Sequence, residues 1–520
     1  MTRDARVKRG TLSVIGLGLA VALAASGCSS STGTSGAAGS PSPKVGGNLV
    51  VGITTDPDNL DPWKATQFQA VNILQTLYGT LTEFDKDLNV VPGLAESWTV
   101  SPDGKTVTMK LRSSVKFADG TTFGSEDVKF SLDKIKDKAT AAVSAASLAS
   151  VTSVDATDAN TVTLHLSAPD AGLLANLAVI NMAMLPSEST PQALKTTPDG
   201  TGPFTLKERK PNQSLTMARN DAYWGTKPSL DTIEFRIIPD ETSIVSAMQS
   251  NNVQLAILND PLVAKTAQSG SLKVTKTAQL SYHVLQLNAR RPVLSDVNVR
   301  LAIQCAVDRQ QVLDTAALGE GEVTGPITSP AYKSDPSARP CPKRDLAKAA
   351  DYLAKAGKSG GVTIKTIVSQ GEYATSVAEA QNLKAQLAEA KITLDLEVLA
   401  SDPYVNKWVA ADFDAAVALN GGRPDPDGMY GRYFTSTGNL NKVAGYSSPD
   451  LDALFAQGKQ SSDPNTRKGI YAKVSQNLED NAAWIWLFTG YTYTVTSSKV
   501  TGFVPMSNGS VQFLRSTALS

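Results

Sequence analysis

The stretch from Gly93 to Leu132 constrains the fold more than any other part of the sequence. It contains a turn at Ser101–Gly104, where proline fixes φ and glycine tolerates a positive φ. Apolar and polar residues then alternate from Val107 to Leu111, which predicts a half-buried strand. A second short strand is expected over 115–117. A helix capped by Ser125 should follow, with an apolar face made by Val128, Leu132 and Ile135.

The same stretch resembles the signature of a known protein family. The matching segments, in order, are Ala95–Trp98, Asp103–Gly104, Val115–Phe117, Asp119–Gly120, Asp127–Val128 and Phe130–Ser131. They resemble bacterial extracellular solute-binding protein family 5, the peptide and nickel receptors of ATP-binding-cassette (ABC) importers. Three further segments extend the resemblance: Gly200–Phe204, Arg219–Trp224 and Ser295–Arg309. The resemblance implies a two-lobed α/β fold of the periplasmic-binding-protein type (type II, large cluster C), with an extra subdomain inserted in the first lobe.

The order of these motifs suggests where the lobes begin and end. The first lobe is expected over 46–288 plus 490–520, with the inserted subdomain over about 78–200. The second lobe is expected over 289–489, so the chain should cross near Asn288 and again near Gly490. Predicted helices at 345–356 and 374–390 alternate with predicted strands at 362–368, 392–399 and 413–419. This alternation favours a parallel sheet in the second lobe.

The N-terminus has the pattern of an export signal. A basic segment precedes an apolar run from Leu12 to Ala25, and the run ends at Ser26-Gly27-Cys28. This ending resembles a bacterial lipobox, so 1–28 is expected to be a lipoprotein signal peptide with Cys28 lipidated. An ordinary cleaved signal is the alternative. The segment 29–45, rich in Ser, Gly, Thr and Ala, should be a flexible tether. The predicted location is therefore the extracytoplasmic face of the cell membrane, held by the lipid anchor alone.

Charge and composition limit the possible partners. Lys plus Arg and Asp plus Glu both number 49 in the 520-residue chain, so the formal net charge is zero. We therefore expect no nucleic-acid partner. After the predicted signal no apolar run is long enough to span a bilayer. We expect a monomer.

The sequence carries no recognisable catalytic or metal-binding motif. The two histidines, His165 and His283, are far apart, and no HExxH, CxxC or Gly-x-Ser-x-Gly segment occurs. Asp425–Gly428 is similar to the start of a calcium loop, but the twelfth position is Ser436 rather than Glu. We therefore expect no enzyme activity, no cofactor and no metal site built by the protein.

Two cysteines remain after the predicted signal peptide. Cys305 lies on a predicted helix and Cys341 in a proline-flanked loop. Because exported proteins fold in an oxidising compartment, we expect a Cys305–Cys341 disulfide. Two separately buried thiols are the alternative.

The resemblance implies a solute-binding lipoprotein of an ABC importer. Such a protein would capture a small solute between two hinged lobes and deliver it to a membrane permease and its ATPase. The resemblance favours an oligopeptide. The alternatives are another solute, such as an oligosaccharide or a chelated metal, and a sensor receptor that does not transport.

The loop after the strand at 413–419 is the candidate ligand-binding segment, because strand carboxyl ends form the usual ligand edge of an α/β lobe. In peptide-binding members of the family this loop holds an aspartate for the peptide's amino terminus, and Gly422 occupies about that position here, so the carboxylate is either missing or displaced to Asp425 or Asp427. Arg423 suits an anionic group instead. The full expected site is Asn420, Gly421, Gly422, Arg423, Asp425, Asp427, Tyr430, Tyr404, Trp408 and Tyr282. The alternative is that Asp425 and Asp427 only shape a turn and Arg423 faces solvent.

Overall fold

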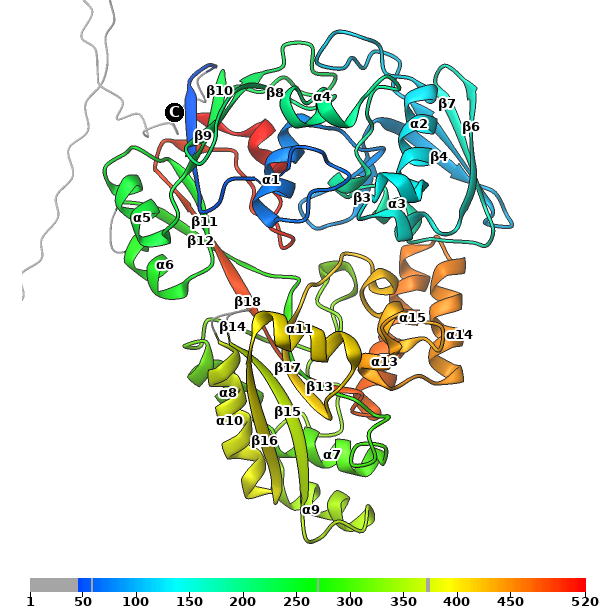
Figure 1. The fold of residues 1–520 in the computed structure, drawn as a ribbon, viewed down its shortest axis with the longest axis vertical. Coiled ribbons are helices and arrows are strands. Elements are labelled where there is room, and N and C mark those ends of the chain that lie inside the picture. The colour runs from blue at the N-terminus through cyan, green and yellow to red at the C-terminus, as the bar shows by residue number, and fades with distance from the viewer. Residues whose placement is uncertain (1–44, 58, 269–270, 371–374) are drawn as a thin grey trace, which may run out of the picture. The chain divides into compact units, whose positions relative to one another are not determined.

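The computed structural model describes residues 45–57, 59–268, 271–370 and 375–520. The predicted signal peptide with Cys28, and the tether as far as residue 44, lie outside the described residues. The described part is an α/β fold with a sheet that runs through two lobes (Figure 1). None of the described helices is long and apolar enough to cross a membrane.

One long strand joins the two lobes (Figure 1). Strand β18 (Trp484–Thr496) pairs with β13 (Tyr282–Leu287) and β14 (Gly321–Val323) over its first half, and with β11 (Leu255–Leu258) and β12 (Lys273–Ala278) over its second half. The partners change between Gly490 and Tyr491. The second connection is the three-residue segment 279–281, between β12 and β13. We therefore place this crossing earlier than the expected position near Asn288, because β13 pairs only with second-lobe strands and β18.

The rest of the sheet extends from both sides of β18. In the first lobe, β1 pairs in parallel with β10 and β11, and β9 and β8 continue the sheet. In the second lobe, β17 pairs with β13 and then in parallel with β15, which pairs in parallel with β16. These strands are β1 (Asn48–Ile53), β8 (Phe204–Lys210), β9 (Ser214–Arg219), β10 (Thr232–Ile237), β15 (Val362–Gln370), β16 (Ile392–Ala400) and β17 (Ala415–Asn420).

The inserted subdomain contains a four-stranded antiparallel sheet covered by a helix. Its strands are β4 (Ala95–Val100), β5 (Thr106–Leu111), β6 (Val151–Asp158) and β7 (Thr161–Leu166), and its helix is α2 (Ser125–Lys136). Val107, Met109 and Leu111 are buried and alternate with more exposed residues, which confirms the predicted strand. Gly104 has a φ of 69° in the turn before it.

Two local predictions in this subdomain are wrong. The segment 115–117 makes only an isolated bridge between Lys116 and Thr122 and pairs with no described strand. Val115 and Phe117 are buried, and this burial produced the apolar pattern that suggested a strand. The helix cap is Gly124, whose N–H donates to Asp127 Oδ2 at 2.9 Å. Ser125 is already inside the helix and donates its hydroxyl to the carbonyl of Asp158.

Helices cover the sheet in both lobes. Ser448 and Asp463 accept hydrogen bonds from Leu451 N and Thr466 N, and a proline follows each, which confirms the predicted helix starts. The longer helices are α1 (Phe68–Leu77), α5 (Glu241–Gln249), α6 (Pro261–Gln268), α7 (Val297–Ala306), α8 (Arg309–Ala316), α9 (Leu346–Lys355), α10 (Ser376–Glu389), α11 (Ser401–Ala410), α14 (Pro449–Gln460) and α15 (Pro464–Asp480). The shorter elements are β2 (Thr82–Phe84), β3 (Val90–Pro92), α3 (Leu173–Asn176), α4 (Pro191–Thr196), α12 (Arg432–Phe434), α13 (Asn441–Ala444), β19 (Val500–Thr501) and β20 (Ala518–Leu519).

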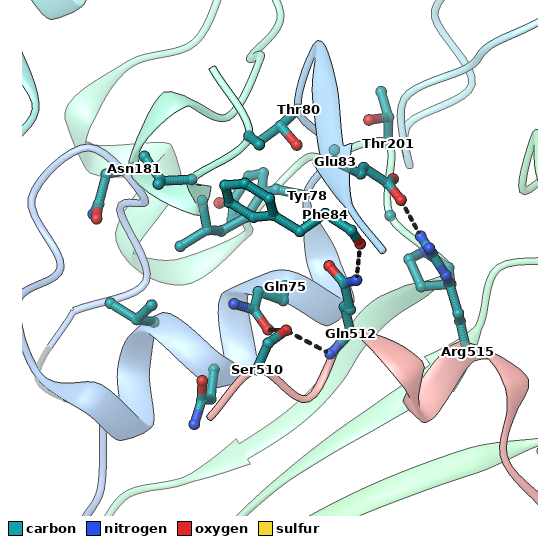
Figure 2. Close-up of a pocket in the computed structure, with 18 of the residues that line it drawn as sticks. Gln75, Tyr78, Thr80, Glu83, Phe84, Asn181, Thr201, Ser510, Gln512 and Arg515 are labelled. Carbon is teal, nitrogen blue, oxygen red and sulfur yellow. Dashed lines mark hydrogen bonds and ion pairs between the residues drawn. The ribbon is translucent and has the colours of Figure 1, made fainter. Parts of the chain in front are cut away.

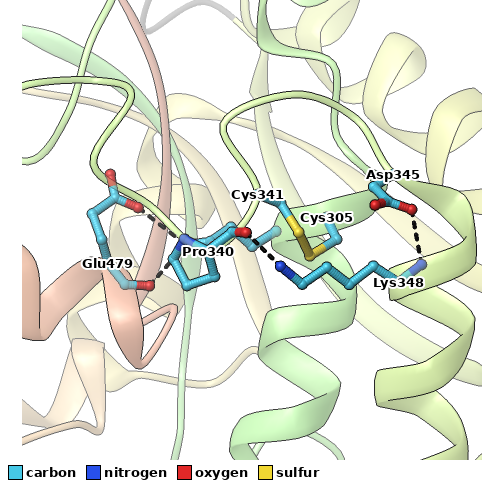
Figure 3. Close-up of a disulfide and its surroundings, with 7 residues drawn as sticks. Cys305, Pro340, Cys341, Asp345, Lys348 and Glu479 are labelled. Carbon is cyan, nitrogen blue, oxygen red and sulfur yellow. Dashed lines mark hydrogen bonds between the residues drawn. A yellow bond between two sulfur atoms is a disulfide. The ribbon is translucent and has the colours of Figure 1, made fainter.

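A disulfide fixes one loop of the second lobe (Figure 3). It joins Cys305 on α7 to Cys341, 36 residues later, with the Cα atoms 5.0 Å apart. Lys348 on α9 donates to the carbonyl of Pro340 at 2.7 Å. The loop is therefore attached to α9 as well as, through the disulfide, to α7.

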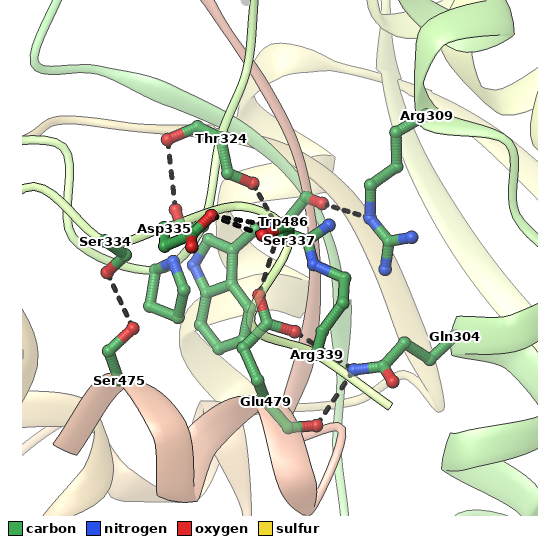
Figure 4. A network of polar contacts seen from close by, with 12 residues as sticks. Gln304, Arg309, Thr324, Ser334, Asp335, Ser337, Arg339, Ser475, Glu479 and Trp486 are labelled. Carbon is green, nitrogen blue, oxygen red and sulfur yellow. Dashed lines mark hydrogen bonds and ion pairs between the residues drawn. The ribbon is translucent and has the colours of Figure 1, made fainter. Parts of the chain in front are cut away.

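The same loop carries a buried ion pair (Figure 4). Arg339 Nη2 lies 3.1 Å from Glu479 Oε1 on α15, and Gln304 Nε2 donates to Glu479 Oε2 at 3.0 Å. Arg309 donates to the carbonyl of Trp486, and burial lowers the pKa of Arg309 to about 9. Buried charges need partners of this kind. Arg339 therefore ties the loop to α15, Gln304 ties α7 to the same glutamate, and Arg309 separately ties α8 to β18.

Candidate functional site

The carboxyl ends of three strands meet at one cavity. Thr54 and Thr55 follow β1, Asn259 follows β11, and the loop from Gly422 to Asp425 follows β17. All of them line a cavity of about 870 Å³, together with Gln279, Leu280 and Ser281 of the segment between the lobes. In open α/β sheets, ligands bind outside the carboxyl ends of strands. This cavity is therefore the candidate binding site.

Most of the residues that line this cavity have uncharged polar side chains. The first lobe supplies hydroxyl and amide side chains, including Gln67, Ser144, Asn176, Asn181 and Asn508. Among the described residues that line the cavity, only Arg423 and Asp425 carry a full charge. The charge that a ligand meets therefore depends on how these two residues are paired.

Asp425 is already neutralised. Its Oδ2 lies 2.7 Å from Arg467 Nη2 on α15, and both side chains are at least nine-tenths buried. Burial acts to lower the pKa of Arg467, but the nearby carboxylate of Asp425 outweighs it and the pKa is raised. Arg467 also donates to the carbonyl of Gly458 and to the hydroxyl of Tyr332. Asp425 thus holds the loop after β17 to α15.

Arg423 is the cation without a partner at the cavity. Its side chain is exposed and forms no ion pair with any described residue. Asp425, two residues later in the same loop, differs because it is paired with Arg467. Partial desolvation by the surrounding protein lowers the pKa of Arg423, and the positive charge of Arg432 lowers it further. Arg432 Nε is buried and makes no hydrogen bond to a described residue. Two guanidinium groups therefore give this end of the cavity a positive potential that favours an anion.

Glycine is required at position 422 because the backbone of Leu280 passes close to it. A Cβ atom at this position would lie 2.0 Å from the carbonyl oxygen of Leu280, which is in the segment between the lobes. A side chain, including the carboxylate of an aspartate, would need the backbone to move. The loop therefore cannot present a carboxylate from position 422 in this geometry.

Asp427 points away from the cavity and toward α14. Its Oδ2 lies 3.4 Å from Lys459 Nζ, and its Oδ1 is buried with no hydrogen-bond partner among the described residues. Burial raises the pKa of Asp427 to about 6. Ala171 of the inserted subdomain donates its N–H to the carbonyl of Lys459 at 2.8 Å, so this corner is also a contact between the lobes.

The aromatic side chains predicted to line the cleft lie elsewhere. Tyr282 and Tyr430 are fully buried with ring centroids 5.8 Å apart, and Trp486 Nε1 donates to the hydroxyl of Tyr430. Tyr404 donates to the carbonyl of Val417, and Trp408 donates to Gln286 Oε1. Asn420 is also buried and donates to the hydroxyl of Tyr282. These residues form the core beneath the loop, and neither they nor Gly421 and Asp427 line the cavity.

Two other cavities border the same region. The larger, of about 1220 Å³, lies between the turn at Ser101–Gly104 and helices α14 and α15, and Lys468 is among its walls. The smaller, of about 240 Å³, lies within the first lobe beside α1 (Figure 2). We favour the cavity of about 870 Å³ as the main site because it is the one of these three that lies at the carboxyl ends of β1, β11 and β17, strands of the main sheet from both lobes.

The first-lobe residues of the site were missed by sequence reasoning. The strand-end argument could have found Thr54, Thr55 and Asn259, since each directly follows a predictable strand. Ser144 and Asn181 come from the inserted subdomain, and only the tertiary fold brings them to the cavity. Within the described residues, no cluster of three or more His, Cys, Asp or Glu side chains could hold a metal ion.

Comparisons with known proteins agree with this architecture. A sequence profile described as "Bacterial extracellular solute-binding proteins, family 5 Middle" matches residues 89–441. The chain belongs to this family of solute-binding proteins. Its members are binding proteins of ABC transporters rather than enzymes, which confirms the prediction made from the motifs.

Relatives of the family match the chain along most of its length. The chain is 27% identical to a probable di/tripeptide-binding protein of Pseudomonas aeruginosa, over 91% of this chain and 96% of the relative. It is 26% identical to the dipeptide-binding protein of Escherichia coli, over 82% and 86%. The solved structure of HbpA2 from Haemophilus parasuis superposes with a TM-score of 0.82 at 25% identity, covering 91% of this chain and all of that one. The two-lobed binding-protein fold of family 5 is thereby confirmed.

Proposed function

We propose that this protein is the solute-binding lipoprotein of an ABC importer and that it captures a short peptide between its lobes. The family assignment supports the receptor role, and the similarity to a probable di/tripeptide-binding protein and a dipeptide-binding protein supports a di- or tripeptide as ligand. Lipidation of Cys28 would hold the monomeric protein at the outer face of the membrane, where it would deliver its ligand to a permease and ATPase.

The observation that carries the ligand assignment is the unpaired Arg423 at a polar cavity. About 870 Å³ lies within the usual range for a small-molecule site. A peptide carboxylate suits the planar guanidinium of Arg423, which can donate two parallel hydrogen bonds. Amide and hydroxyl side chains around it suit the peptide backbone. Because Asp425 is occupied by Arg467, a carboxylate for the peptide's free amino group is not offered by the described walls.

The connections between the lobes suit hinged closure around this ligand. The segment 279–281 and β18 at Gly490–Tyr491 are the two crossings, and Gln279–Ser281 line the cavity themselves. Few residues would need to rotate for the lobes to close, as in other hinge motions. A ligand that contacts both lobes would favour the closed form over the open form.

The experiment is calorimetric titration of acetylated and free-amino di- and tripeptides into the wild type and Arg423→Ala. We expect the best peptide to bind at least tenfold more weakly to Arg423→Ala, about 1.4 kcal/mol. The thermal midpoint of the empty variant should not fall, because Arg423 is exposed.

Lys468→Ala is the matched control, because Lys468 is an exposed cation at the larger cavity. It should leave affinity unchanged. If Lys468→Ala weakens binding and Arg423→Ala does not, the ligand occupies the other cavity. Acetylated and free-amino forms binding equally well would agree with the absence of an amine anchor.

A further inference from the structure

The first lobe contains a small chamber beside the main cavity (Figure 2). Its volume is about 240 Å³, and α1, the strand β2 and the C-terminal segment around Ser510–Arg515 form its walls. Phe84, Val179, Asn181 and Asn508 line both this chamber and the main cavity. A ligand in the main cavity could therefore extend a side chain past these residues into the chamber.

The walls of the chamber offer polar groups with unused hydrogen-bonding capacity. Asn72 is 5% exposed, and no hydrogen bond joins its amide to a described residue. Thr201 is fully buried, and its hydroxyl has no partner in the described part of the chain. Gln75 Oε1 accepts from Ser510 Oγ and Val511 N, which leaves the amide nitrogen of Gln75 as a further donor. Buried polar groups of folded proteins are normally hydrogen-bonded. These groups indicate a polar occupant.

The charges of the chamber cancel. Its charged lining residues are Glu83 and Arg515, and Arg515 Nη1 lies 2.6 Å from Glu83 Oε2 (Figure 2). Burial raises the pKa of Tyr223, another wall residue, to about 12, so its hydroxyl stays neutral. A charged group that entered would lose its hydration without finding an unpaired opposite charge. The chamber therefore favours a neutral group that both donates and accepts hydrogen bonds.

We propose that this chamber is a specificity subsite for the side-chain carboxamide of a glutamine or asparagine residue in the bound peptide. Among neutral amino-acid side chains, the carboxamide offers two donors and an acceptor oxygen, which match the amide of Asn72, the amide nitrogen of Gln75 and the unpartnered hydroxyl of Thr201. A site that hydrogen-bonds a ligand group discriminates strongly against an analogue lacking it. This inference rests on the proposed peptide-binding function.

The test uses acetylated tripeptides in which glutamine, glutamate or methionine replaces alanine at each position in turn. These side chains are similar in length and differ in charge and hydrogen bonding. Calorimetry should show that one position prefers glutamine at least tenfold over both others in the wild type. In Asn72→Leu, the preference for glutamine over methionine should fall to about twofold or less, while the affinity for the methionine peptide is retained. The thermal midpoint of the empty variant should not fall, since Asn72 has no partner to lose.

Asn176→Leu is the matched control, because Asn176 lines the main cavity but not the chamber. It should keep the glutamine preference. Peptides that bind and depend on Arg423 but show no glutamine preference would overturn the subsite alone, as would a preference unchanged in Asn72→Leu. Failure of every peptide to bind would overturn the proposed function and the subsite with it.

Discussion

Arg467 on α15 and Asp425, in the loop that presents Arg423, form a buried ion pair with 2.7 Å between Nη2 and Oδ2. The pair connects α15 to the loop after β17. It neutralises the one carboxylate among the described residues that line the cavity, and Arg423 is left there as a charge without an ion-pair partner. The electrostatic character of the site is therefore set by a residue on a helix that sequence reasoning did not connect with it.

Removing one member of this pair should destabilise the protein strongly. Arg467→Met would leave Asp425 buried without its partner, and we expect the free energy of unfolding to fall by about 3–5 kcal/mol. The double variant Asp425→Leu/Arg467→Met should recover much of this loss, because no buried charge then remains. Urea unfolding of the wild type and both variants measures the difference. Equal stability of single and double variants would show that the charge pair is not responsible.

Asp427 should make stability depend on pH. Its pKa in the folded protein is about 6, above the ordinary value, so the folded state binds this proton more tightly than the unfolded state. Stability from this group is therefore present at low pH and lost as pH rises through 6. Asp427→Asn should exceed the wild type in unfolding free energy at pH 7.5, by at most about 3 kcal/mol. The difference should vanish near pH 4, and a constant difference from pH 4 to 7.5 would contradict the assignment.

The Cys305–Cys341 bridge should contribute substantially to stability. It closes a segment of 36 residues. The chain-entropy model gives about 3–4 kcal/mol for a loop of this length. We expect Cys305→Ala/Cys341→Ala to lose about that much in urea unfolding. Reductant should have no further effect on the variant but should lower the stability of the wild type. Two free thiols in unfolded, unreduced mature wild type would show that the bridge does not form.

Lipidation is predicted to depend on Cys28. Cys28→Ser should release the protein into the medium or leave it unprocessed, because the thiol that would carry the lipid is gone. Fractionation and the mass of the mature protein measure both outcomes. Membrane retention at unchanged mass in Cys28→Ser would exclude the lipid anchor.

The sequence by itself determined the local elements of this protein. The turn at Ser101–Gly104, the alternating strand that follows it and the proline-started helices after Ser448 and Asp463 all occur as predicted. Each depends on contacts between residues a few positions apart, so the signal lies within a short segment. The family motifs in the same segments were sufficient for the two-lobed fold.

Only the tertiary structure decided which residues line the candidate cavity. Tyr282 lies on β13, whose residues are all buried, and such a strand shows no alternation to mark one face. Its assignment to the core, like the ion pair of Asp425 with Arg467, depends on elements distant in the chain. The cavity itself combines strand ends from both lobes with residues of the insertion. Such long-range packing leaves no local pattern, because its partners are selected by how the sheets and helices stack.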